Sequence, residues 1–166
     1  MRYNINLLIP ELLQNIPEIQ TEYLEMLLEY RDGAEKLSEQ DIQELRDIRI
    51  MHNIPESDLN TPGISLVFDA LVTPLIVKLA VEKKSANRLS EIMEWIETLA
   101  KSEVLDIHNL ISVCTCESLI TTYEDSLSGV FPFMGKRTRE LCKLQFDEWR
   151  LSPETFELFK NVNPIK

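Results

Sequence analysis

Glycine, aromatic residues and cysteine are all scarce in this chain of 166 residues. Four glycines and an aromatic content of 7% leave little material for hairpin-rich β-sheets. Leu, Ile and Glu are frequent instead, and these residues favour helices. The cysteines number three, and a chain of this length buries a core without covalent staples, so we expect free thiols.

Secretory and membrane-spanning segments are not expected either. The first residues lack a basic patch followed by an apolar run and a small-residue cleavage site, which predicts a cytoplasmic protein. The longest apolar stretch, Ile64–Val81, is interrupted by Asp69, Pro74 and Lys78. A charge near the centre of a bilayer costs at least about 2.5 kcal/mol. We therefore expect a buried helix here.

The pattern holds no clear catalytic or metal-binding constellation. Cys114 and Cys116 are two residues apart, so on a helix their side chains diverge by about 200° and do not share an ion. Neither of them, nor Cys142, lies in a local signature that would pair it with a histidine as a nucleophile. The sequence therefore predicts no enzyme, no cofactor and no metal. A hydrolase that uses scattered carboxylates stays open as an alternative.

Apolar periodicity predicts one all-α domain spanning residues 1–166, a bundle of about seven or eight helices. The pair of helices that begins at Ser85 and Glu103 resembles a helical-repeat hairpin. Residues 129–135 are predicted to form a hydrophobic loop, and Pro74 is predicted to break or kink the apolar stretch. The expected helices are Pro17 to about Tyr30, Ser38 to about His52, two short ones or one kinked helix in Ile64–Val81, one from Ser85, Glu103–Ser126, Lys136–Arg150 and a short one from Ser152-Pro153.

The formal charge of −11 is unevenly distributed. Residues 11–60 carry 13 acidic and 4 basic side chains, a net charge of −9, whereas residues 131–166 carry 5 and 7, a net charge of +2. Binding of a duplex phosphate backbone depends on Lys and Arg, so the acidic region excludes direct nucleic-acid binding from that side.

Four glutamates fall on one face of the first predicted helix, with Tyr23, Leu27 and Leu28 assigned to the core. Like charges at these spacings repel by roughly 0.2–0.5 kcal/mol per pair, and no lysine is interleaved. Two interpretations of this row of glutamates are kept: a solubilising surface, or a docking surface for a basic partner. This acidic face consists of Glu18, Glu22, Glu25 and Glu29.

Two further sets of residues are candidates for partner binding. Lys136, Arg139 and Lys143 form a basic row at spacings of three and four; they bind a phosphate or carboxylate partner, or they pair with acidic helices of the same chain. Phe131 and Phe133 lie in the predicted loop, where they serve as an exposed hydrophobic anchor or plug the end of the bundle.

Several segments resemble a family of small uncharacterised bacterial proteins. The resemblance covers about residues 60–145 and implies an all-α fold without catalytic residues. Proteins of this kind are often suspected to be immunity partners of secreted bacterial toxins. The segments that carry it are Arg88–Glu97 (RLSEIMEWIE), Ile107–Val113 (IHNLISV), Glu117–Leu119 (ESL) and Met134-Gly135.

The charge asymmetry and the resemblance together predict an immunity or antitoxin-like protein. It would neutralise a basic bacterial toxin domain by covering its active surface with the acidic face. The alternative is a helical scaffold or adaptor that binds a peptide in an apolar groove near Phe131 and Phe133. The oligomeric state stays open.

Overall fold

A computed structural model describes residues 5–34, 62–82, 85–146 and 150–163 of the chain. Within these ranges eight continuous helical segments are present and no strand, which confirms the all-α fold class. The chain divides into two compact units, residues 6–67 and residues 68–166 with 1–5, and the single domain stays a prediction. The predicted helix after Ser38 lies outside the described ranges.

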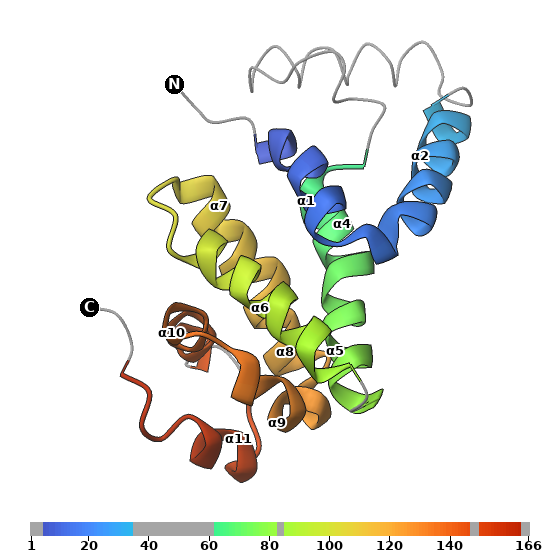
Figure 1. Cartoon of the computed structure of the whole chain (residues 1–166). Helices are drawn as coiled ribbons and strands as arrows, with labels where there is room; N and C mark the ends of the chain where they lie inside the picture. The colour runs from blue at the N-terminus through green and yellow to red at the C-terminus, as the bar shows by residue number, and fades with distance from the viewer. Residues whose placement is uncertain (1–4, 35–61, 83–84, 147–149, 164–166) are drawn as a thin grey trace. The chain divides into compact units, whose positions relative to one another are not determined.

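The smaller unit begins within the short 3₁₀ helix η1 (Ile5–Leu8). Helix α1 (Ile9–Asn15), the 3₁₀ helix η2 (Pro17–Ile19) and helix α2 (Gln20–Ala34) follow (Figure 1). Ile19 and Tyr23 are buried, so the face of the helix that carries these two residues is its core side. The helix predicted from Pro17 is confirmed and extends beyond Tyr30. The assignment of Leu28 to the core is wrong: its position faces away from Ile19 and Tyr23, and it is 51% exposed.

A continuous helix follows, made of α4 (Ile64–Val67), the π-helical segment η4 (Phe68–Val72) and α5 (Thr73–Glu82). The chain stays helical through Pro74, and the predicted discontinuity takes the form of the π segment directly before it. A proline leaves one backbone carbonyl of the preceding turn without its usual donor, and a π turn is one way to accommodate this. By length and composition alone this helix would cross a membrane, a test that core helices also pass; 39% of its apolar window is buried.

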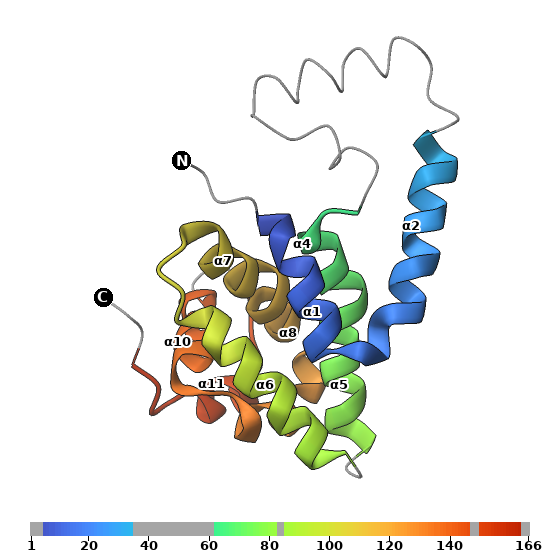
Figure 2. The ribbon, with the colours of Figure 1, turned by 45° about the horizontal axis from the view of Figure 1, so that its top comes forward.

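The larger unit contains α6 (Ala86–Ala100) and a second long helix of α7 (Leu105–Leu110), π segment η5 (Ile111–Glu117) and α8 (Ser118–Thr121) (Figure 2). Helix α10 packs against α6 and η5, while α5 packs against α6 and α9. Both the Ser85 and Glu103 helices are thus present, with the second one ending earlier than predicted. The remaining elements are η6 (Glu124–Ser126), α9 (Leu127–Val130), η7 (Phe131–Phe133), α10 (Lys136–Leu144) and α11 (Pro153–Leu158).

The hydrophobic loop predicted for residues 129–135 is wrong, because residues 127–133 form α9 and η7. Gly129 lies inside this helix, where an added Cβ would be 3.5 Å from Ala80 Cβ. An added Cβ would thus be in ordinary van der Waals contact, and the glycine lies within a helix rather than a turn. Helix α10 ends at Leu144, earlier than predicted. The start at Ser152-Pro153 is confirmed, and the Ser152 side chain accepts a hydrogen bond from the Thr155 N–H.

A buried hydroxyl connects the first residue of α5 with the π segment η5. Thr73, which follows η4, is fully buried, and its Oγ1 donates to the backbone oxygen of Cys114 in η5 at 3.0 Å. A π turn shifts the backbone hydrogen bonds from their α-helical register, and the hydroxyl supplies a donor to the carbonyl in this region.

Replacing Thr73 by Val should lower the free energy of unfolding by about 1–3 kcal/mol, because the shape is kept and the donor is lost. Thr98 is the matched control: its hydroxyl donates to Glu94 O at 3.0 Å on the exposed side of α6. Chemical denaturation of Thr73→Val, Thr73→Ser and Thr98→Val measures the effect. Equal stability of the two valine variants would contradict the assignment.

Candidate functional site

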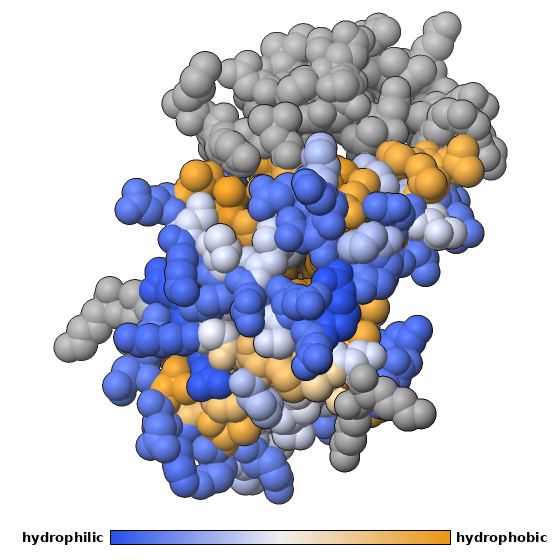
Figure 3. All heavy atoms as spheres, in the orientation of Figure 1, coloured by the Kyte–Doolittle hydropathy of each residue, from blue (hydrophilic) through white to orange (hydrophobic). Residues whose placement is uncertain are grey.

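The acidic face on α2 and η2 is open to solvent. The Glu18, Glu22, Glu25 and Glu29 side chains are all exposed. Leu24 and Leu28, one helical turn apart, are 59% and 51% exposed and border this row of carboxylates. Figure 3 shows apolar surface in the region of α2, with hydrophilic side chains below it. The smaller unit therefore presents carboxylates and an apolar pair, Leu24 and Leu28, on neighbouring parts of one helix.

Sequence reasoning did not single out the apolar pair. The available signal was the spacing: Ile19 and Tyr23 lie four residues apart and define the buried side, and positions 24 and 28 fall on the other side. Tyr23 is 7% exposed, and its burial raises the pKa of the phenol. Among the described residues of this unit, the two exposed leucines lie outside the buried core.

The basic row belongs to α10, in the larger unit. Lys136 is 90% exposed and lies 3.8 Å from Glu140 of the same helix. Arg139 donates to the backbone oxygen of Phe131 at 3.1 Å, and Lys143 donates to two backbone oxygens, of Phe159 at 2.8 Å and of Val162 at 2.6 Å. Two of the three cations thus bind neutral carbonyl groups, which leaves their charge uncompensated by these contacts.

Phe131 and Phe133 are half-buried in η7. The Phe131 ring packs edge-on against Phe159, with ring centroids 4.8 Å apart, and the Arg139 guanidinium lies 4.4 Å from its centroid. These contacts join η7 to α10 and to the end of α11. Phe131 therefore has packing partners inside the larger unit, and Arg139 connects it with the basic row.

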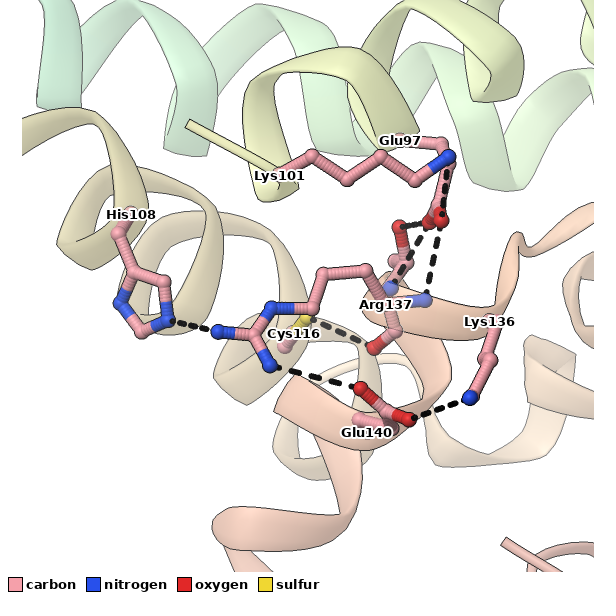
Figure 4. A network of polar contacts seen from close by, with 8 residues as sticks. Glu97, Lys101, His108, Cys116, Lys136, Arg137 and Glu140 are labelled. Carbon is pink, nitrogen blue, oxygen red and sulfur yellow. Dashed lines mark hydrogen bonds and ion pairs between the residues drawn. The ribbon is translucent and has the colours of Figure 1, made fainter. Parts of the chain in front are cut away.

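Glu97 of α6 forms the centre of a polar network at the beginning of α10 (Figure 4). Although its carboxylate is charged, Glu97 is only 8% exposed. It accepts hydrogen bonds from the backbone N–H of Arg137 at 3.0 Å, from that of Thr138 at 2.9 Å and from the Thr138 hydroxyl at 2.8 Å. Lys101 lies 3.2 Å away on the solvent side. A carboxylate from another helix thus caps α10, whose own N-cap residue is Gly135.

The pKa of Glu97 is lowered. Burial alone raises it, but the hydrogen bonds from the Thr138 and Arg137 backbone, the Thr138 hydroxyl and Lys101 outweigh that effect. Gly135 is required by the close approach of this carboxylate, since an added Cβ would overlap with the end of the Glu97 side chain. Neither the cap nor the need for glycine was foreseen from the sequence.

The rest of the network surrounds this cap. Arg137 lies 3.4 Å from Glu140, and its other terminal nitrogen is 3.5 Å from His108 Nε2. The Cys116 thiol is fully buried. Burial is the main cause that raises its pKa well above the ordinary value, and the neighbouring Cys142 raises it further. A buried neutral thiol is a poor nucleophile. In the ranges that the structure describes, no group of three or more His, Cys, Asp or Glu side chains has the arrangement of a metal site.

Replacing Glu97 by Gln should lower the free energy of unfolding by about 1–3 kcal/mol near neutral pH, since a charged acceptor of buried hydrogen bonds is lost. The lowered pKa means that Glu97 contributes stability above the unfolded-state pKa of about 4.3 and loses it as the pH falls through the folded-state value. The difference between Glu97→Gln and wild type should therefore shrink on acidification. Exposed Glu94 on the same helix, mutated to Gln, is the control, and denaturation series at several pH values provide the measurement.

Gly135→Ala should destabilise the protein by a similar amount, because the new methyl group displaces the Glu97 carboxylate. In a Glu97→Ala background the same change should cost much less, and a double-mutant cycle measures that coupling. Strictly additive effects of the two substitutions would show that Gly135 and Glu97 do not depend on each other.

Comparison of the chain with models of known protein families, with curated proteins and with solved structures gave no match.

Proposed function

We propose that this protein is an immunity or antitoxin-like binding protein that neutralises a basic bacterial toxin domain through the acidic face. The observation that carries the proposal is the exposure of Glu18, Glu22, Glu25 and Glu29 along one helix. Like charges so close together repel each other, and a basic partner relieves that cost while the carboxylates accelerate the encounter. The role is binding without catalysis, in the cytoplasm.

The apolar pair gives this surface a second component. Leu24 and Leu28 lose exposed apolar area when a partner covers α2, at roughly 25 cal/mol per Å². Charge complementarity mainly sets the rate and the specificity of association, whereas apolar anchors contribute affinity. A toxin surface that fits this helix therefore carries Lys and Arg side chains around an apolar depression.

The second candidate function is a helical adaptor that binds a peptide by apolar contacts. Its support is an exposed apolar surface near the end of the larger unit, where Leu144 is 42% and Phe156 is 51% exposed and Phe156 packs edge-on against Phe146. Binding there should depend little on ionic strength, unlike binding to the acidic face.

Replacing Glu22, Glu25 and Glu29 together by Lys should abolish toxin neutralisation. The control replaces Glu82, Glu103 and Asp125 by Lys, three exposed acidic residues outside α2, so that the net charge changes equally. The partner is first isolated from the source cells with the wild-type chain as bait at low salt and released at high salt. Each variant is then co-expressed with that partner, and growth is measured.

Wild type and the control variant should both restore growth, while the α2 variant should not. A partner that is not toxic, or a toxic partner that the α2 variant still neutralises, would contradict the proposal. Persistent capture at high salt that is lost on Phe156→Ser would favour the adaptor instead.

A further inference from the structure

We propose that a cleft between α10 and residues 161–163 binds the phosphate group of a small molecule. The cleft has a volume of about 270 Å³ and is lined by Lys136, Arg139, Glu140, Asn161, Val162 and Asn163. This volume lies just below the range of about 300–1,000 Å³ for small-molecule sites, so it suits a phosphate with at most a small attached group rather than a folded partner. The inference does not depend on the proposed function.

The charge on α10 is the first argument for an anion. Its nine residues include four basic side chains and one acidic one, a net charge of 4 − 1 = +3, in a chain with a net charge of −11. The single acidic residue, Glu140, already lies 3.4 Å from Arg137 and 3.8 Å from Lys136. In the described part of the chain no carboxylate forms an ion pair with Arg139 or Lys143. Both side chains donate hydrogen bonds to backbone carbonyl oxygens instead.

The shape of the cleft is set by the protein itself. Lys143 donates to Phe159 O and Val162 O, which ties the chain after α11 to α10 along one wall. Arg139 is held by the Phe131 backbone and ring on the other side. These contacts hold Arg139 and Lys143 in place, while the Lys136 side chain extends into solvent.

The donors of the cleft match a phosphate group. Lys136, 90% exposed, offers an ammonium group, and Asn161 and Asn163 contribute exposed amides to the lining. Arg139 contributes positive charge to the lining, while its Nε atom is buried out of reach of a ligand. The backbone N–H groups of Arg137 and Thr138 are occupied by Glu97, so the side chains carry the recognition. Charge-assisted hydrogen bonds of this kind hold phosphate oxygens strongly.

The test is an NMR titration of the full chain with inorganic phosphate, phenyl phosphate and acetate at constant ionic strength. Saturable amide shifts of residues in α10 and 161–163 are expected with phosphate, and the affinity should fall roughly tenfold in Lys136→Gln, in which one charge-assisted contact is lost. Lys160→Gln is the control, because Lys160 pairs with exposed Glu157 and does not line the cleft. It should bind as wild type does.

Tighter binding of phenyl phosphate would identify a phosphate monoester as the ligand, and equal binding would identify free phosphate. The proposal is overturned if no saturable shift occurs at tens of millimolar, if acetate binds as well as phosphate, or if Lys136→Gln and Lys160→Gln weaken binding equally.

Discussion

The Glu97 carboxylate, buried at the start of α10, is the interaction on which the arrangement of the larger unit depends. A buried charge is stable only when it is fully hydrogen-bonded, and Glu97 meets this condition by accepting from the Arg137 and Thr138 backbone and the Thr138 hydroxyl. The same bonds satisfy N–H groups that a helix leaves free at its first turn. This contact joins the start of α10 to α6, in addition to the packing of α10 against α6 and η5.

This capping explains how the chain combines a strongly acidic composition with a basic helix. Because Glu97 occupies the first-turn N–H groups, the positive character of α10 is carried by its side chains, two of which bind carbonyl oxygens. On α2 the carboxylates of the acidic face are exposed instead. Each proposal follows from one of these two concentrations of charge, and each names ligands of the opposite sign.

The sequence predicted the elements whose signals are local. The Pro17 helix and the Ser152-Pro153 start follow from capping and periodicity within a few residues. Residues 129–135 were predicted as a loop because glycine and proline break most helices. In the structure Pro132 lies in the first turn of the 3₁₀ helix η7, and Gly129 lies inside α9, where an added Cβ would be 3.5 Å from Ala80 Cβ.

The candidate sites were predictable only in part, because some of their contacts join residues that are far apart in the sequence. The acidic face follows from helical spacing, and exposure of all four glutamates agrees with that spacing. The Glu97 cap joins residues about 40 positions apart. A sequence search for a cap considers the residues next to the first turn, and the residue at that position, Gly135, has no side chain that could act as a cap. The hydrogen bond from Thr73 to Cys114 likewise joins two helices whose residues are 41 positions apart. Long-range contacts of this kind leave no periodic signal.

The most direct measurement of the central claim follows the Glu97 side-chain carboxyl carbon and the Arg137 and Thr138 amides by NMR as the pH is lowered. The account predicts that the pKa of Glu97 lies below the ordinary value of a glutamate, and that both amides shift with the same midpoint as Glu97. An ordinary midpoint for Glu97, with amides that do not respond to it, would contradict the claim that this carboxylate caps α10.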